Sequence, residues 1–250
     1  MGRFIPMKKR ITLSISFILL LAACKSKQET VKYAGASKIT SDVKEYSLTD
    51  SIILPYKKKL ENEMNTVLVY AEGEFTKAIP EGTLGNLVAD IALHTAQQIT
   101  EVDFCILNNG GLRTMLPKGD ITKGKIFELM PFENELVVVS LSAEKMSELF
   151  EYIASKGGQP VAGISLTIKK DKTAKNILIN NEPFNAAKKY NIVTTDYLAN
   201  GGDQMSFFKN PLAIQYLNIK LRDAIVHFLI EKKNKNQTII PYTDKRVANE

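Results

Sequence analysis

Apolar residues recur at three- and four-residue intervals in several parts of this chain, and this spacing is typical of helices with one buried face. The pattern predicts helices around 54–68, from Thr83, shortly before Met130, from Ser142, and over a long closing segment. The closing segment is marked by Leu217, Leu221, Ala224, Ile225 and Phe228. The lysines that follow it suit the negative end of a helix dipole.

Five shorter runs are rich in β-branched and aromatic residues, which favour strands. These runs are Val67–Tyr70, Phe104–Leu107, Leu136–Leu141, Val161–Ile168 and Tyr190–Thr195. Gly163 interrupts the fourth run, and the charged segment 169–181 after it resembles a hairpin. The chain is therefore expected to contain both helices and strands.

Two of the strand runs end in similar glycine-containing loops, Asn108–Arg113 and Asp196–Asp203. Paired glycines allow positive φ and a close approach of a ligand to the main chain. Asparagine offers donors and acceptors, and the arginine fork suits phosphate or carboxylate. From its own residues, the first loop could be a binding loop or a tight turn with a surface arginine.

A third loop is predicted around Phe132. Pro131 disfavours helical backbone at Met130, so the preceding helix should end there and leave Phe132 on a loop. The alternative for Phe132, as for Tyr197 in the second glycine loop, is a place in the hydrophobic core.

The N-terminus has the pattern of a bacterial export signal. Four basic residues precede the apolar run 11–21, which is too short to span a bilayer comfortably. The run closes on Leu21-Ala22-Ala23-Cys24, which resembles a lipobox, the sequence in which the cysteine is lipidated. We expect a signal peptide over 1–23, a tether over 24–46 and one folded domain over 47–250, in a lipoprotein tethered to the bacterial cell envelope. The alternative is an ordinary secretory signal with a chance cysteine.

Composition adds little beyond this. The chain has 250 residues, 44% of them hydrophobic and 24% charged, as in an ordinary folded protein. Its net charge of +6 includes the four basic residues of the expected signal peptide, so nucleic acid is not an expected partner.

The sequence offers few candidates for a reactive cysteine or a metal site. Cys105 lies within an apolar strand run and is expected to be an inert core residue. The two histidines, His94 and His227, both fall in helical patterns. Asn86, Asp90 and His94 share one helix face, but asparagine is a poor transition-metal ligand. We expect no metal or cofactor in this chain, and we expect Asn86 and Asp90 to hold loops.

Several segments match one family in order and spacing. Residues 84–90 (LGNLVAD) resemble its helix start, 109–113 (NGGLR) its NGGIR loop, 131–134 (PFEN) its PF-x-N element and 198–203 (LANGGD) its LANGGD loop. Arg222-Asp223-Ala224, Ile240-Pro241 and Arg246 also fit. The chain from about Leu54 to Glu250 thus resembles the C-terminal domain of 5′-nucleotidases and UDP-sugar hydrolases. The resemblance implies a single-domain α/β fold layered as an α/β/β/α sandwich.

The resemblance also implies roles for individual residues in nucleotide recognition. Phe132 and Tyr197 would sandwich the base, and Asn134 would bind its edge. Asn108 and Arg113 would contact the ribose and phosphate region, and Asp203 the ribose hydroxyls. Backbone contacts would come from Gly110, Gly111, Gly201 and Gly202, and Gly163 would offer its backbone to the base.

The metallophosphoesterase domain of full-length members has no match here. Its Asp-x-His and Gly-Asn-His motifs are absent from the sequence, and Lys77 alone stands where many relatives place phosphate-binding arginines. The leading hypothesis is a stand-alone nucleotide-recognition domain, inactive alone, that supports nucleotide catabolism with a separate metallophosphoesterase chain carrying the divalent metals. The alternatives are a non-catalytic nucleotide- or nucleoside-binding envelope lipoprotein, and an envelope interaction module that no longer binds a ligand.

Overall fold

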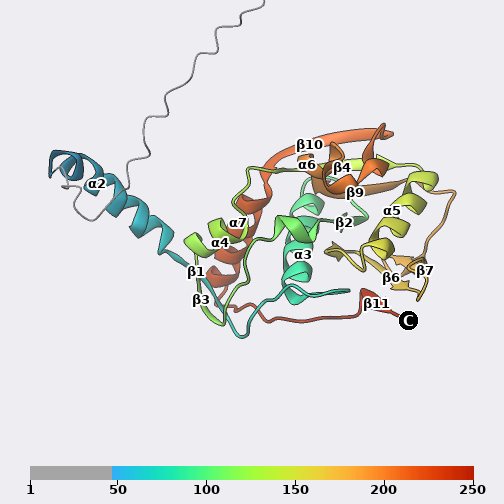
Figure 1. Ribbon diagram of the computed structural model, residues 1–250, viewed down its shortest axis with the longest axis horizontal. Coiled ribbons are helices and arrows are strands. Elements are labelled where there is room, and N and C mark those ends of the chain that lie inside the picture. The colour runs from blue at the N-terminus through green and yellow to red at the C-terminus, as the bar shows by residue number, and fades with distance from the viewer. Residues whose placement is uncertain (1–46) are drawn as a thin grey trace, which may run out of the picture. The chain divides into compact units, whose positions relative to one another are not determined.

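A computed structural model describes residues 47–250 of the chain, with side chains from Ser51 onward (Figure 1). The predicted signal peptide 1–23, the tether 24–46 and the lipidation site Cys24 lie outside the described residues. Residues 51–250 form one compact unit. The first described element is helix α2, Ser47–Met64, which begins earlier than the helix predicted around 54–68.

A five-stranded sheet is the centre of this unit, with the strand order β10-β4-β9-β2-β5. Only β2 and β9 run parallel; the other neighbours are antiparallel. The strands are β2 (Phe104–Ile106), β4 (Glu135–Leu141), β5 (Val161–Ala162), β9 (Tyr190–Thr195) and β10 (Ala213–Lys220). Because β2 and β9 are parallel neighbours, the two glycine loops that follow them leave the sheet at the same edge.

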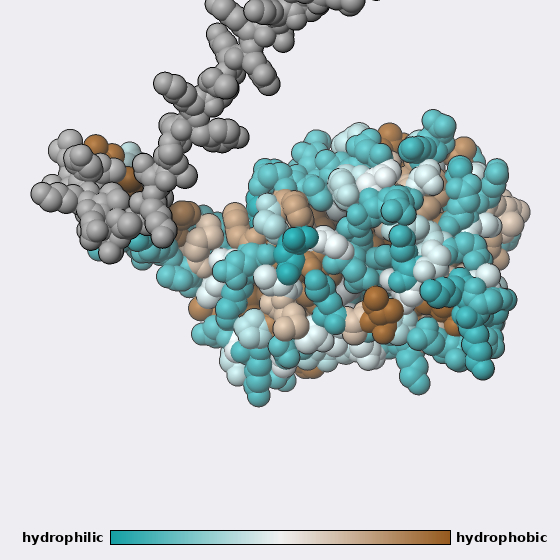
Figure 2. Space-filling view, in the orientation of Figure 1, coloured by the Kyte–Doolittle hydropathy of each residue, from teal (hydrophilic) through white to brown (hydrophobic). Residues whose placement is uncertain are grey.

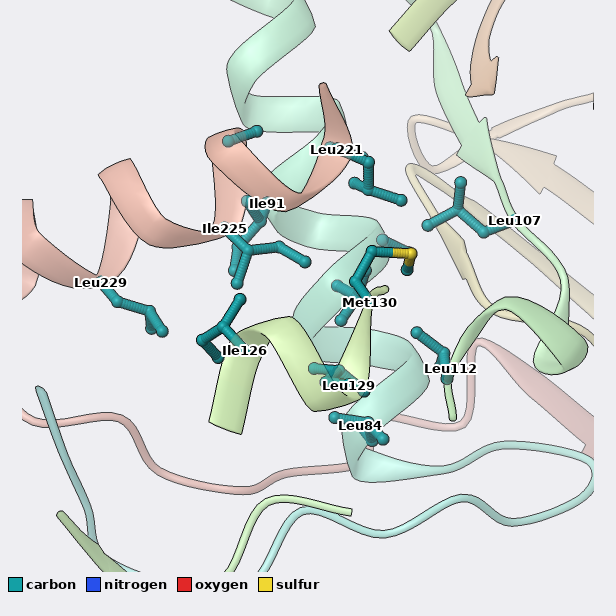
Figure 3. Close-up of a cluster of buried hydrophobic side chains, with 14 of the residues drawn as sticks. Leu84, Ile91, Leu107, Leu112, Ile126, Leu129, Met130, Leu221, Ile225 and Leu229 are labelled. Atoms are coloured by element: carbon teal, nitrogen blue, oxygen red, sulfur yellow. The ribbon is translucent and has the colours of Figure 1, made fainter. Parts of the chain in front are cut away.

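Helices cover one face of this sheet. Leu136 and Val138 of β4 belong to a buried cluster that also contains residues of α3 (Thr83–Gln97), α4 (Lys123–Leu129) and α7 (Leu221–Asn234). Figure 3 shows side chains of these three helices converging in that cluster. Successive strand residues point to opposite faces, so Val137 and Val139 face the other way.

The opposite face of the sheet is covered by α5 and a second sheet. Val137, Val139 and Leu141 are buried with residues of α5 (Ala143–Ser155). The same cluster includes residues of the four-stranded sheet, ordered β11-β6-β7-β8. Its strands are β6 (Ile164–Ile168), β7 (Ala174–Ile179), β8 (Glu182–Pro183) and β11 (Val247–Asn249). A third sheet pairs β1 (Val67–Ala71) with β3 (Gly119–Thr122). The predicted α/β fold in one domain is confirmed.

Local sequence signals explain several element boundaries. The Ser142 hydroxyl accepts a hydrogen bond from the Lys145 N–H, as expected of a helix cap. Helix α4 ends at Leu129, directly before Met130-Pro131. Helix α3 begins at Thr83, as its spacing predicted, and the Thr83 hydroxyl accepts a hydrogen bond from the Thr76 N–H.

The predicted start of the closing helix was wrong. Leu217 lies in strand β10, and α7 begins only at Leu221. Asn218 has a φ of 56°, and the pairing of β10 with β4 shifts register between Tyr216 and Lys220. A left-handed residue is incompatible with a helix, whereas a bulge lets the strand bend there and bury Leu217.

No helix within residues 47–250 is long and apolar enough to cross a membrane.

Candidate functional site

The first glycine loop is anchored in the core at both ends. Leu107 and Leu112 flank residues 108–111, and both side chains are buried. Both belong to the buried cluster of Figure 3. Between the two leucines, Asn109–Gly111 forms a short 3₁₀ helix. The Arg113 N–H then donates to the Leu129 carbonyl at 2.9 Å, so the loop is fixed on both sides.

Gly111 is required by a close approach inside this loop. A Cβ at Gly111 would lie 2.8 Å from Asn108 Oδ1, which is closer than carbon and oxygen atoms pack. A Cβ at Gly110 would lie 3.3 Å from Asn108 Nδ2 and 3.4 Å from Asp203 Oδ2. The glycines therefore leave room for the Asn108 side chain and its partner.

The loop that carries Phe132 and Asn134 is held by charged and backbone contacts. Met130, at its start, is buried, whereas the Phe132 side chain is 39% exposed. Glu133 forms ion pairs with Lys220 and with Arg222, and the Arg222 guanidinium carbon lies 4.2 Å from the centre of the Phe127 ring. The Asn134 carbonyl accepts a hydrogen bond from the Leu221 N–H at 2.9 Å.

The second glycine loop brings an aromatic ring and a carboxylate together. Tyr197, on helix α6 (Asp196–Ala199), is 47% exposed. Gly201 has a φ of 90°, and a Cβ at Gly202 would lie 2.5 Å from atoms of the Tyr197 ring. These two glycines let the chain turn sharply beneath the ring. Asp203 follows in the left-handed region, with a φ of 49° and a ψ of 28°.

Hydrogen bonds at Asp203 join the two glycine loops. Asn108 Nδ2 donates to one carboxylate oxygen of Asp203, and the Tyr197 hydroxyl donates to the other at 3.3 Å. The Tyr152 hydroxyl of α5 donates to the Asp203 carbonyl oxygen at 2.9 Å. Burial, together with the nearby Asp203 and Tyr197, raises the pKa of Tyr152 to about 12, so its hydroxyl keeps its proton at neutral pH.

The three loops enclose a pocket of about 310 Å³. Eight predicted site residues line it: Asn108, Gly110, Gly111, Arg113, Phe132, Asn134, Tyr197 and Asp203. Gly201 and Gly202 shape the second loop without lining the pocket. The pocket thus combines two aromatic faces, a carboxylate, two amides and a guanidinium.

Gly163 lies elsewhere in the fold. It separates β5 from β6, and its neighbour Ala162 pairs with Cys105 of β2. A Cβ at Gly163 would lie 2.7 Å from the Asp103 carbonyl oxygen, and φ there is 79°. Asp103 precedes β2 whereas Asn108 follows it, so Gly163 is at the end of β2 opposite to the pocket. Backbone packing explains this glycine.

Lys77, the one cation within residues 75–83, supports the first loop from outside the pocket lining. Its Nζ donates to the Leu112 carbonyl oxygen at 2.9 Å. Arg113 is the cation in the pocket lining itself. Its Nη1 lies 3.4 Å from the Gly110 carbonyl oxygen, and its guanidinium carbon lies 6.0 Å from the centre of the Phe132 ring.

Asn86 and Asp90, which were expected to hold loops, contact the C-terminal segment. Asn86 Nδ2 donates to the Tyr242 carbonyl oxygen at 3.3 Å, and Asp90 forms an ion pair of 2.6 Å with Arg246. Within residues 47–250, no three His, Cys, Asp or Glu side chains are placed to hold a metal ion. Cys105 is buried, and burial raises the pKa of its thiol well above its usual range. The structure therefore confirms its prediction as an unreactive core residue.

Tyr152 and Gln159 belong to the surroundings of the site but carried no sequence signal. Gln159 Oε1 accepts a hydrogen bond from the Asn109 N–H at 3.0 Å, and Tyr152 fixes Asp203 as described. Both residues come from the segment around α5, which the sequence pattern marked only by its apolar stripe. Their contacts depend on tertiary structure, which residue spacing does not encode.

The ion pairs of Glu133 predict a pH dependence of stability. Hydrogen bonds from Lys220 and Arg222 lower the pKa of Glu133 from 4.5 to about 2 in the folded protein. A carboxyl with a lowered folded pKa stabilises the protein above its unfolded pKa and loses that contribution as the pH falls. Glu133→Gln should therefore flatten the acid limb of the stability curve between about pH 4.5 and pH 2, as measured by urea unfolding at each pH. Glu182→Gln, at another exposed carboxylate, is the control and should leave that limb unchanged.

A comparison with family models places this fold and pocket in a known context. The model of the 5′-nucleotidase C-terminal domain matches residues 65–210. That range includes α3, both glycine loops and the loop of Phe132, which together build the pocket.

Known proteins agree with this match. A 5′-nucleotidase of Vibrio parahaemolyticus is 27% identical over 185 residues, covering 69% of this chain and 31% of that protein. A trifunctional nucleotide phosphoesterase of Bacillus subtilis is 33% identical over 143 residues, covering 51% of this chain and 10% of that protein. The crystal structure of a Thermus thermophilus 5′-nucleotidase precursor superposes with a TM-score of 0.70 at 22% identity, covering 81% of this chain and 43% of the other.

The chain thus spans about a third of the length of the curated Vibrio relatives that it matches. This chain belongs to the 5′-nucleotidase family and carries its C-terminal domain.

Proposed function

We propose that this chain recognises a nucleotide or nucleoside for a 5′-nucleotidase-type hydrolase system, and that a separate metallophosphoesterase chain performs the hydrolysis. Such a system would serve nucleotide catabolism. The single observation that carries the proposal is the pocket in which Phe132 and Tyr197 flank the cluster of Asn108, Arg113 and Asp203.

The pocket offers a separate kind of group for each part of a nucleoside. Aromatic rings stack on the flat face of any base. The Asn134 amide has both donors and acceptors for a base edge. The Asp203 carboxylate can accept two hydrogen bonds from the vicinal hydroxyls of ribose, replacing those it now accepts from Asn108 and Tyr197.

The phosphate side of the ligand is assigned to Arg113. A guanidinium binds phosphate oxygens in pairs through two parallel N–H groups. Since Lys77 is engaged by the Leu112 carbonyl, Arg113 is the cation in the pocket lining that is placed to meet a phosphate. We therefore expect a modest gain in affinity for a nucleotide over the corresponding nucleoside.

Hydrolysis is assigned to another chain because two-metal phosphoester chemistry needs ligands that clamp both the attacking and the leaving oxygen. The described residues do not fit such a centre, since they hold no metal-binding group of three His, Cys, Asp or Glu side chains. The longer relatives are named as whole enzymes, and this chain covers a minor part of them.

The cellular setting is also part of the proposal. Cys24 at the end of the lipobox-like segment would carry lipid and tether the domain to the cell envelope. The membrane leaflet that this anchor would occupy does not affect the chemistry of the pocket.

Because hydrolysis is assigned to a separate chain, we expect that the purified chain alone will not hydrolyse AMP or UDP-glucose above the background rate, with Mn²⁺, Zn²⁺ or Mg²⁺ present. Phosphate release is the measurement, and an intact 5′-nucleotidase of the family assayed in the same buffers is the positive control. Enzymatic phosphate release by this chain alone would contradict the two-chain model. Recovery of a metallophosphoesterase chain after gentle cross-linking and purification would support it, whereas nucleotide binding without such a partner would favour a pure binding lipoprotein.

A further inference from the structure

Helix α2 exposes an unusual amount of apolar surface. Every described side chain from Ser51 to Glu63 is solvent-exposed. Five of them are large and apolar, with exposed fractions between 51% and 74%: Ile52, Ile53, Leu54, Tyr56 and Leu60. Isolated exposed apolar residues are common, but a group of five on one helix indicates a surface that contacts something else. Figure 2 shows brown side chains beside teal ones along this helix.

Four of the five apolar residues lie on one side of the helix. Ile52, Tyr56 and Leu60 are spaced by four residues and Ile53 precedes Tyr56 by three, which places the four in a single stripe. Leu54 falls outside that stripe. The stripe precedes Glu63, which pairs with Lys123 at the start of α4.

Lysines border this stripe on both sides. Lys57 follows Tyr56 by one residue and Lys59 precedes Leu60 by one, so the two lysines lie to either side of the apolar stripe. Lys58 adds a third positive charge on the opposite side of the helix. The described residues 51–60 contain no acidic side chain. The first acid after them, Glu61, lies 4.0 Å from Lys57.

We propose that α2 lies on the surface of an anionic lipid bilayer, with Ile52, Ile53, Tyr56 and Leu60 in the headgroup region. Lysines on both flanks of an apolar stripe are the arrangement in which long side chains extend from the membrane toward phosphate headgroups. Charge complementarity therefore favours an anionic bilayer over a protein groove. No described helix can span a membrane, so α2 lies on the bilayer and does not cross it.

This contact does not depend on nucleotide recognition. It would add a second, electrostatic attachment to the lipid expected at Cys24. It would also fix α2, and with it the adjoining domain, close to the bilayer.

The chain has no tryptophan, so a single introduced tryptophan can report on α2 alone. The full chain carrying Tyr56→Trp is reconstituted into vesicles of phosphatidylglycerol and phosphatidylcholine, with brominated phosphatidylglycerol as the quencher. Tyr70→Trp, at an exposed position of β1, is the matched control. We expect a blue-shifted emission and strong quenching at position 56, and neither at position 70.

Charge reversal tests the electrostatic part of the contact. In the Tyr56→Trp background, Lys57→Glu, Lys58→Glu and Lys59→Glu together should reduce quenching at position 56 at least about tenfold, because each lysine near an anionic surface contributes to binding. Adenosine binding by this variant should be unchanged, which separates this test from that of the proposed function. Equal quenching at positions 56 and 70, no quenching at either, or protection of position 56 only by an added protein would overturn the proposal.

Discussion

Replacing Phe132 or Tyr197 by alanine should weaken nucleoside binding about 5- to 150-fold, which corresponds to about 1–3 kcal/mol for each ring. This range is the usual contribution of one aromatic side chain that stacks on a base. Both rings line the pocket and both are partly exposed, so their faces are accessible to a ligand. Titration calorimetry with adenosine measures the change directly.

Tyr216→Ala is the control for this prediction. Tyr216 is an exposed tyrosine of β10 that does not line the pocket, so its truncation should leave adenosine affinity unchanged. Tyr197→Phe separates stacking from hydrogen bonding, because it keeps the ring and removes only the hydroxyl that donates to Asp203. Unchanged affinity in both alanine variants would show that these rings do not clamp a base.

Leu112→Ala should lower the free energy of unfolding by about 2–5 kcal/mol, the range measured for large-to-small substitutions in well-packed cores. Leu112 is almost fully buried and packs in the cluster of Figure 3, at the end of the first glycine loop. Its truncation leaves a cavity directly beneath the loop that carries Arg113. Urea unfolding followed by circular dichroism gives the loss.

Met115→Ala is the matched control, because Met115 lies three residues further along the same loop and is exposed. It should change the free energy of unfolding by no more than about 0.5 kcal/mol, as is usual for surface positions. If Leu112→Ala were equally mild, the loop would not depend on the core for its position. A folded Leu112→Ala protein should also bind adenosine more weakly, because its loop has lost one of its two anchors.

Local sequence signals located the loops that line the pocket. Pro131 ended helix α4 and left Phe132 on a loop, because proline restricts the residue before it. Strand runs followed by paired glycines identified both pocket loops. A Cβ at Gly111 would lie too close to the Asn108 side chain, and a Cβ at Gly202 too close to the Tyr197 ring. The family resemblance supplied the pairing of those loops, which no local pattern contains.

Predictions failed where a tertiary contact decided the outcome. Leu217 has helical spacing from Leu221, yet β10 reaches Lys220 because its backbone pairs with β4. Gly163 matched a glycine expected beside the base, but the approach of the Asp103 carbonyl accounts for it at the other end of β2. In both cases the residue type fitted two environments, and long-range strand pairing selected one.

The electrostatic contacts within the pocket also could not be predicted from the sequence. Asp203 was identified as a carboxylate for ribose, but the bond that it accepts from Asn108 of the other loop links segments about 95 residues apart. This bond fixes the two loops relative to each other before any ligand arrives. A ligand whose hydroxyls donate to both carboxylate oxygens of Asp203 would therefore displace the Asn108 amide toward the ribose or phosphate.

The most direct test of the central claim is titration calorimetry of the purified chain with adenosine, AMP and UDP-glucose in turn. The account predicts saturable heat at one site per chain for at least one of these ligands, with that signal strongly reduced in the Asp203→Ala variant. It also predicts that AMP binds more tightly than adenosine by a margin that Arg113→Gln removes. Absence of heat with all three ligands, from a chain shown by circular dichroism to be folded, would contradict nucleotide recognition by this pocket.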